Sequence, residues 1–347
     1  MDDTLTRDSP FTDVRGNSVS DAPTDLLIVT NSTDATVDLL FKHGLPNRLH
    51  VFRFNFDLFE AYDVACEPEN FELVDPIGRR CTLATTRKAY LRKPLPASNL
   101  SAEAAYLQAE QSYALRSILN MLWRCEKLVL VEPDAERTRL DKFRQLSVAS
   151  RYFRVPRGMF ANRPIKHWTD ANLTVVKSLS GAYLGDNVVF TTLINPEELT
   201  TGYPWFLQQY VSAPFDLTSV FVRGRVFSYR LDRTFLKETP DWRASREENT
   251  YARGTWVPID TSTSLDARIQ GYMRDLQLHY GRLDFLVDHA GDVVFCEVNP
   301  NGQFGWLDPT DATGLISTIA REIAPDTEVA PLPYSPFGVP TAASGAT

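Results

Sequence analysis

Residues 284–308 constrain the fold of this chain more than any other segment. They read DFLVDHAGDVVFCEVNPNGQFGWLD, two apolar runs separated by the polar residues His289 to Asp292. Two such runs joined by a short polar turn predict a pair of antiparallel strands. We therefore expect a β-hairpin here, as part of a larger sheet.

Acidic and amide side chains lie in this hairpin where buried strands would not carry them unopposed. Side chains alternate along a strand, so one face is expected to carry Val293, Phe295, Glu297 and Asn299. Asp284 can face the same pocket if the two runs pair. Two carboxylates and an amide oxygen form the hard, oxygen-only site that Mg²⁺ shares with phosphates. In the alternative interpretation, Asp284 only opens a strand, Glu297 lies on an exposed edge, and NPNG is only a turn.

The segment from Asp284 through FCEVNPNGQFGWL resembles the ATP-grasp ligases. Within them it is most similar to the graspetide synthetases, the microviridin-type macrocyclases that form side-chain ester and amide links in ribosomally made peptides. The ribosomal-protein glutamate ligases are more distant relatives. The resemblance implies that Asp284, Glu297 and Asn299 bind magnesium, as two ions that bridge the phosphates of ATP. It covers residues 134–325 well and the preceding part more loosely.

Bulk properties exclude several other classes of protein. The 347 residues suffice for two or three domains, and the net charge of −8 with a pI near 5.3 argues against a nucleic-acid partner. No apolar run approaches the roughly 20 residues of a membrane span. Residues 1–25 lack the hydrophobic core of a signal peptide, so none is expected there. The four cysteines form no CxxC pair, which argues against zinc and for reduced thiols in a cytoplasmic protein.

Apolar runs alternate with helical patterns in residues 24–133, which predicts an N-terminal α/β domain. The resemblance implies that this domain is of the pre-ATP-grasp type. Residues 1–23 and 331–347 are expected to be disordered, because they are poor in apolar groups. A helix is expected from Ser32 or Thr33 to Gly44. A second helix over 102–125 has an apolar stripe consisting of Ala104, Ala105, Leu107, Tyr113, Leu115, Leu119, Leu122 and Trp123. The predicted strands are 25–31, 49–55, 88–94 and 127–133.

The resemblance implies that residues 134–330 form the ATP-grasp domain. Their sequence pattern predicts β-rich segments between helices, and the whole chain is expected to be α/β (α+β) in class. The pair Arg223–Gly224 predicts a hairpin turn. Helices are expected over 141–153, 264–281 and 314–325, and strands over 173–179, 187–194, 205–211 and 217–232.

Two lysines are candidates for phosphate contacts. Lys177 lies in an apolar strand pattern, where a lysine is costly unless it meets an anion, and a loop of small residues follows it. The resemblance implies a phosphate contact and a catalytic role for Lys177. It also implies a nucleotide-phosphate contact for Lys142, although Asp141 replaces the family's usual asparagine. The alternatives are a lysine at a strand end and a lysine on a surface helix.

The segment WFLQQYV resembles the family's linker strand, whose backbone binds the adenine edge. The resemblance implies backbone contacts from Tyr210 and Val211 and a side-chain contact from Gln208 or Gln209. It also implies a ribose contact from Asp216. Without the neighbouring motifs, the same residues would be a core strand with a polar edge.

Two arginine positions bear on catalysis. Relatives usually have an arginine two residues after the equivalent of Asp216, where this chain has Thr218. Arg230 and Arg233 are nearby substitutes. Arg243, within Asp-Trp-Arg, matches a motif of the peptide-macrocyclising branch, and its guanidinium could hold an acyl phosphate with paired N–H donors. The alternative is a loop arginine paired with an acidic neighbour.

The resemblance implies an ATP-dependent carboxylate–amine or carboxylate–alcohol ligase that works through an acyl phosphate. The expected substrate is a ribosomal precursor peptide, linked through its side chains. One alternative joins a free amino acid or small amine to a protein or small-molecule carboxylate. Another is a nucleotide-binding pseudoenzyme, suggested by Thr218 in place of arginine. The expected partners are ATP, Mg²⁺ and a homodimer partner, without nucleic acid or membrane.

Overall fold

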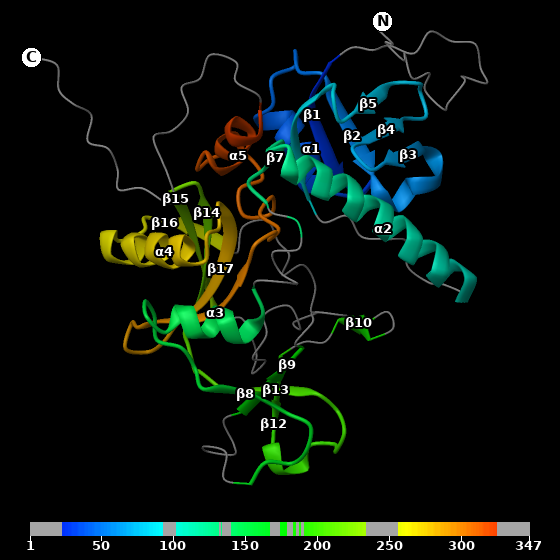
Figure 1. The fold of residues 1–347 in the computed structure, drawn as a ribbon. Helices are drawn as coiled ribbons and strands as arrows, with labels where there is room; N and C mark the ends of the chain where they lie inside the picture. The colour runs from blue at the N-terminus through cyan, green and yellow to red at the C-terminus, as the bar shows by residue number, and fades with distance from the viewer. Residues whose placement is uncertain are drawn as a thin grey trace, which may run out of the picture. The chain divides into compact units, whose positions relative to one another are not determined.

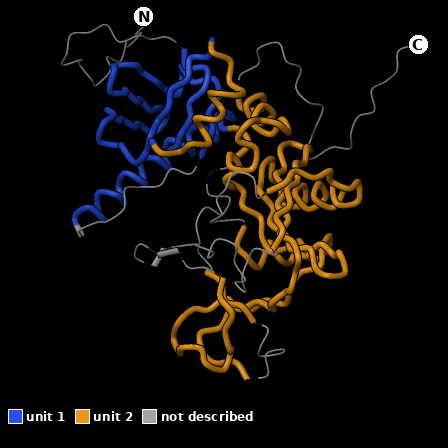
Figure 2. The backbone as a smooth tube through the Cα atoms, turned by 180° about the vertical axis from the view of Figure 1, so that it is seen from behind, with its two compact units in different colours: residues 1–32, 48–128 blue, residues 33–47, 129–347 orange. Residues whose placement is uncertain are grey.

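The computed structural model has the fold drawn in Figure 1. It describes residues 23–92, 102–131, 133, 140–166, 174–178, 183–184, 187–188, 191–233 and 256–324. The chain divides into two compact units (Figure 2): unit 1 comprises residues up to 32 and 48–128, and unit 2 comprises residues 33–47 and 129 onward. Residues 33–47, which the sequence analysis placed in the N-terminal domain, therefore group with the second unit. The predicted disordered segments lie outside the described residues, apart from residue 23.

Unit 1 is built on a sheet with the strand order β2-β1-β6-β7, in which β2 and β6 both pair with β1 in parallel. The central strand β1 is buried almost throughout, as its continuous apolar sequence predicts for a parallel strand covered on both faces. The strands are β1 (Thr24–Thr30), β2 (Val51–Asn55), β6 (Thr86–Leu91) and β7 (Leu128–Val129). The four strands predicted in this region are thus confirmed, with β7 shorter than expected.

Unit 1 also contains a three-stranded antiparallel meander, which the sequence analysis treated as an irregular stretch. The short 3₁₀ helix η1 (Phe56–Ala61) precedes it. Its strands are short and carry charged residues among the apolar ones, so the alternation was easy to miss. They are β3 (Asp63–Glu67), β4 (Asn70–Val74) and β5 (Arg80–Thr82).

The long helix α2 (Ala102–Arg124) has nearly its predicted length, but only part of the predicted stripe is buried. Leu115, Leu119 and Leu122 are buried, whereas Tyr113 is 67% exposed. Leu107 and Trp123 are also exposed. The apolar stripe was therefore a wrong prediction in its N-terminal half and at Trp123. The N-terminal end of α2 projects beyond the strands of unit 1 (Figure 1).

Helix α1 (Ala35–His43) in unit 2 is capped by Asp34, whose side chain accepts from Thr36 N. The expected cap, Ser32 or Thr33, was wrong by one or two positions, and Gly44 ends the helix as predicted. Helix α1 packs against α5 (Leu315–Ile323), where a Cβ at Gly44 would lie 2.3 Å from Ala320 Cβ.

A four-stranded antiparallel sheet of unit 2 has the order β12-β9-β13-β8. Helix α3 (Lys142–Ala149) precedes this sheet in the sequence. Asp141 caps its N-terminus, and the Asp141 carboxylate accepts hydrogen bonds from two backbone N–H groups. The strands are β8 (Gly158–Ala161), β9 (Thr174–Lys177), β12 (Thr192–Ile194) and β13 (Trp205–Gln209). Two short elements pair separately as β10 (Tyr183–Leu184) and β11 (Asn187–Val188), and η4 (Pro196–Glu198) is a 3₁₀ turn.

A five-stranded antiparallel sheet, β16-β15-β14-β17-β18, forms the rest of unit 2. The predicted turn is confirmed: Arg223 and Gly224 both have positive φ between β14 and β15. One face of the sheet packs against α3 and α4 (Thr263–Asp275) through a core that includes Phe153, Tyr272 and Phe295. The strands are β14 (Phe215–Val222), β15 (Arg225–Asp232), β16 (Trp256–Ile259), β17 (Tyr280–Val287) and β18 (Val293–Asn299).

No helix in the described part of the chain is long and apolar enough to cross a membrane.

Candidate functional site

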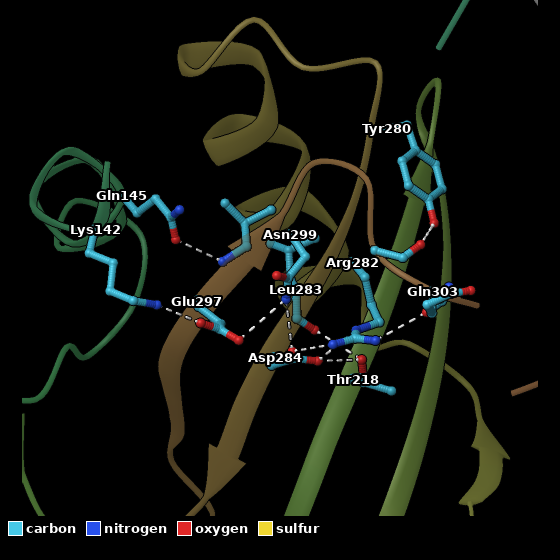
Figure 3. Close-up of polar contacts among 12 residues, drawn as sticks. Lys142, Gln145, Thr218, Tyr280, Arg282, Leu283, Asp284, Glu297, Asn299 and Gln303 are labelled. Atoms are coloured by element: carbon cyan, nitrogen blue, oxygen red, sulfur yellow. Dashed lines mark hydrogen bonds and ion pairs between the residues drawn. The ribbon is translucent and has the colours of Figure 1, made fainter. Parts of the chain in front are cut away.

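The predicted hairpin forms from strands β17 and β18, and it places Asp284 directly opposite Glu297. Asn299 lies opposite Arg282. Asn299 Nδ2 donates to Asp284 Oδ2 at 3.2 Å and to Glu297 Oε1 at 3.3 Å (Figure 3). The three residues predicted as a metal site therefore meet on one face of the sheet.

A β-bulge at Cys296 corrects the expected alternation along β18. Asp284 pairs with Glu297, but the next residue, Phe285, pairs with Phe295, so Cys296 is an extra residue. Phe295 is fully buried in the core on the opposite face, and Val293 packs against that core. The prediction that both share a face with Glu297 was therefore wrong.

Further donors surround the carboxylate of Asp284. Thr218 Oγ1, on the neighbouring strand β14, donates to Asp284 Oδ1 at 2.8 Å. Arg282 Nε and Nη2 donate to the two carboxylate oxygens at 3.2 and 2.9 Å (Figure 3). Neither Thr218 nor Arg282 was assigned a contact from the sequence. The signal for Arg282 was its position two residues before Asp284, which places both on one face of a strand.

Lys142 lies next to the carboxylates, and the phosphate contact expected of it remains a prediction. Its Nζ donates to Glu297 Oε2 at 2.8 Å. One helical turn further along α3, Gln145 accepts from Val298 N at 3.1 Å and donates to Leu140 O at 3.1 Å. Gln145 thus fixes helix α3 on strand β18 and holds Lys142 over Glu297.

The charges of the site shift the pKa values of its groups. Burial by itself would raise the pKa of Glu297, but the positive charges of Lys142, Lys177 and Arg282 hold it well below its usual range. Burial raises the pKa of the Cys296 thiol to about 11, and the nearby lysine, Lys177, opposes this rise. Glu297 is therefore ionised at neutral pH and available to a cation.

Lys177 ends strand β9 and pairs with Phe206 of β13, so the two side chains share a face. Phe206 in turn contacts Phe143 of helix α3, with ring centroids 5.8 Å apart. The positive charge of Lys177 acts on both Glu297 and Cys296. The structure thus brings Lys177 near Glu297 and Cys296. Most of the small-residue loop after Lys177 lies outside the described residues.

The predicted adenine strand, β13, presents one glutamine to the face that carries Lys177. Gln208 pairs with Val175, two residues before Lys177, and is only 2% exposed. Within the described residues, its Nε2 has no hydrogen-bond partner. Gln209 is exposed on the other face, with its backbone N bonded to Arg157 O. Of the two glutamines named for this contact, Gln208 is therefore the better placed.

Tyr210 and Val211 follow strand β13 and are half-buried. Their predicted backbone contacts to a base remain predictions.

Asp216 is buried on β14, and its carboxylate is held by Arg233 Nη1 at 2.8 and 2.9 Å. The ribose contact predicted for Asp216 remains a prediction. Arg230, the other arginine named as a substitute, pairs with Leu217 and so shares the apolar face of the sheet. Its guanidinium lies 4.5 Å from the centroid of the Phe215 ring.

Arg243, the predicted acyl-phosphate contact, lies outside the described residues. Its role remains a prediction.

The residues at the end of the hairpin fit a magnesium ion. Asp284 and Glu297 supply carboxylate oxygens, and Asn299 supplies an amide oxygen if its side chain turns by half a rotation from the conformation in which Nδ2 donates. Hard cations prefer such all-oxygen sets. Lys142 and Lys177 beside them provide the positive charge that a phosphate requires. The arrangement suits a metal ion bound jointly with a phosphate chain.

No protein-family model and no curated protein matches the sequence significantly. The structure, in contrast, is similar to solved structures. The macrocyclase MdnC from Microcystis aeruginosa MRC, bound with its precursor peptide MdnA, has a TM-score of 0.71 and 22% identity, over 86% of this chain and 98% of that chain.

Two further structures are similar over nearly their whole length. A RiPP-associated ATP-grasp ligase of Chryseobacterium gregarium, in complex with ADP and a leader and core peptide, has a TM-score of 0.71 and 21% identity, covering 88% of this chain and 99% of that chain. The ATP-grasp ligase PsnB, complexed with a minimal precursor, Mg and ADP, has a TM-score of 0.64 and 14% identity, covering 88% and 98%. The chain therefore has the fold of the ATP-grasp ligases, as the sequence predicted.

Proposed function

We propose that this protein is an ATP-dependent ligase that joins a carboxylate to an amine or a hydroxyl through an acyl phosphate. The observation that carries the proposal is the cluster of Asp284, Glu297 and Asn299 with Lys142 beside it. The cluster places oxygen ligands for a hard cation next to a lysine. A bound nucleoside triphosphate requires both, because its phosphates are neutralised by a metal ion and by cationic side chains. The shared fold of the ATP-grasp ligases supports the same interpretation.

The reaction has two steps. A substrate carboxylate oxygen attacks the γ-phosphorus of ATP, the bond to the bridging oxygen breaks, and ADP leaves. An amine nitrogen or hydroxyl oxygen then attacks the acyl carbon, loses its proton and expels inorganic phosphate. No covalent bond to the protein is formed, so the protein contributes orientation and charge neutralisation.

The site residues have distinct parts in this scheme. Asp284, Glu297 and Asn299 would hold magnesium, which neutralises phosphate oxygens when bound. Lys142 and Lys177 would contact the phosphates, and Lys177 would also neutralise charge during transfer. The buried Nε2 of Gln208 would donate to the nucleotide base, and Tyr210 and Val211 would contribute backbone groups.

The proposed substrate is a ribosomal precursor peptide. MdnC was solved with a precursor peptide, the Chryseobacterium ligase with a leader and core peptide, and PsnB with a minimal precursor. By analogy, an Asp or Glu side chain of the peptide would be activated and joined to a Ser, Thr or Lys side chain. We also infer from the resemblance that Arg243 would hold the acyl phosphate and that the enzyme would be a homodimer.

Mass spectrometry of a candidate precursor encoded beside this gene tests the proposal. With enzyme, ATP and Mg²⁺, we expect the peptide to lose one water per linkage and the enzyme to release one ADP for each. The Glu297→Gln variant should form neither product. If ADP appears only with a free amino acid or small amine, the substrate is of the alternative class. Nucleotide binding without turnover under any acceptor would contradict ligase function and favour a pseudoenzyme.

A further inference from the structure

Arg282 is a half-buried cation of the site that the scheme above does not use. It lies on β17 opposite Val220, on the sheet face that also carries Thr218 and Asp284. Its side chain is 18% exposed. Its charge acts on Asp284 and on Glu297.

The guanidinium of Arg282 is fixed on several sides. Besides its two bonds to Asp284, it donates from Nη1 to Gln303 O at 3.1 Å (Figure 3), and it lies 5.8 Å from the Trp306 ring centroid. A Cβ at Gly302 would lie 2.6 Å from Arg282 Cβ, so glycine is needed beside it. The Tyr280 hydroxyl donates a hydrogen bond to Gly302 O at 2.6 Å. The surroundings therefore place this arginine in one orientation.

Only part of the donor capacity of Arg282 is used in this arrangement. A guanidinium has five N–H groups, and within the described residues three of them serve Asp284 and Gln303. One N–H on each terminal nitrogen remains for an anion beside the two carboxylates.

The residue at position 218 shows why the position of Arg282 matters. Thr218 stands where the resemblance leads us to expect an arginine, directly opposite Asp284. Arg230 cannot substitute from the apolar face, and Arg233 is held by Asp216. Arg282, diagonal to Thr218 on the adjacent strand, brings a guanidinium to the same carboxylate.

We propose that Arg282 supplies the guanidinium of this site from strand β17, orienting Asp284 and facing the transferred phosphoryl group. This inference rests on the proposed ligase function. Thr218 then completes the orientation of Asp284 with its hydroxyl instead of carrying the charge itself. The site has retained its arginine in a different place, so the threonine at position 218 does not imply loss of turnover.

Exchanging the two residues tests this inference. Arg282→Thr should lower turnover about 10²-fold, as loss of one preorganised donor group does, and should weaken binding of Mn²⁺ with a non-hydrolysable ATP analogue, measured by calorimetry. The double variant Arg282→Thr/Thr218→Arg returns a guanidinium to the opposite strand. It should recover at least a tenth of the lost turnover and much of the lost affinity.

Arg282→Lys keeps the charge without the forked geometry and should lie between wild type and Arg282→Thr. This variant also provides the answer if Arg282→Thr does not fold. The matched control is Arg230→Gln, an arginine on the opposite face of the same sheet, which should change neither quantity.

Wild-type affinity and turnover in Arg282→Thr would overturn the inference. So would a folded double variant no better than Arg282→Thr, because a guanidinium at position 218 would then not replace it. If the wild-type protein itself bound no metal–nucleotide complex, that result would contradict the proposed ligase function, whatever the Arg282 variants did. The two failures can therefore be told apart.

Discussion

The two faces of the five-stranded sheet in unit 2 are made by the same strands but have opposite composition. One face packs Phe285 and Phe295 against Phe153 and Tyr272. The other carries Asp284, with Glu297 and Asn299 beside it. The apolar face stabilises the fold, and the charged face presents groups that are costly for the fold but useful for binding anions and cations.

The bulge at Cys296 lets strand β18 place side chains on both faces of the sheet where strict alternation would not. One extra residue lets Phe295 remain in the core while Glu297 stays opposite Asp284. Without the bulge, strict alternation would force Phe295 and Glu297 onto one face. Substitutions on the two faces should therefore have separable effects, one on activity and the other on stability.

The largest expected effect is on the charged face. Glu297→Gln should lower ligase turnover about 10⁴-fold, or roughly 5 kcal/mol of transition-state stabilisation, because it removes a metal-binding charge. The free energy of unfolding should change by only about 1 kcal/mol, since Glu297 is partly exposed. ADP release and urea unfolding measure the two quantities. Parallel losses of both would contradict the separation of the faces.

On the apolar face, Phe295→Ala should lower the free energy of unfolding by about 3–5 kcal/mol, because it leaves a cavity among buried aromatic rings. In protein that remains folded, turnover should stay within an order of magnitude of wild type. Urea titration followed by tryptophan fluorescence checks the stability. A variant that unfolds normally but has lost turnover would show that this face also serves the reaction.

A smaller effect is expected from Lys142→Met, and it should depend on pH. A carboxylate whose pKa is lowered in the folded state stabilises the fold above its unfolded pKa, about 4.3 for glutamate, and this stabilisation is lost as pH falls towards the folded value. Burial raises and the cations lower the pKa of Glu297, with Lys142 the largest lowering contribution. The variant should lose about 1 kcal/mol at neutral pH.

The difference between Lys142→Met and wild type should shrink as the solution is acidified below the usual glutamate pKa. Urea unfolding over a series of pH values measures it. A difference that stayed constant with pH would mean that Lys142 does not stabilise the ionised form of Glu297.

The smallest effect concerns the bulge residue itself. Burial raises the pKa of Cys296 to about 11, so little thiolate is present at mildly alkaline pH. Iodoacetamide should therefore label the exposed Cys125 well before Cys296. Peptide mapping at successive times gives both rates within one sample. Equal rates would indicate that the strand opens around the bulge.

Much of this fold could be predicted from local sequence patterns. The pairing of Asp284 with Glu297 follows from two apolar runs and a polar turn, and the Arg223–Gly224 turn follows from its position between alternating strands. The resemblance implied phosphate contacts for Lys142 and Lys177, and the structure brings both lysines near Glu297. These features depend on short-range periodicity or on specific motifs.

Other features depend on tertiary contacts that a sequence does not display. A single extra residue such as Cys296 leaves no mark in an apolar strand, so the bulge was missed. The sequence analysis gave Arg282 no role, because only its contacts with Asp284 and Gln303 in the folded protein distinguish it. Tyr113 on α2 is exposed, and helical periodicity alone cannot reveal how much of a long helix is covered by the rest of the fold.

Binding of Mn²⁺, followed by electron paramagnetic resonance with a non-hydrolysable ATP analogue, tests the central claim most directly. Wild-type protein should bind the ion tightly when the nucleotide is present. Asp284→Asn should weaken this binding at least about tenfold, whereas Arg230→Gln on the opposite face should not. Unchanged affinity in a folded Asp284→Asn variant would contradict the assignment of the charged face as the metal and nucleotide site.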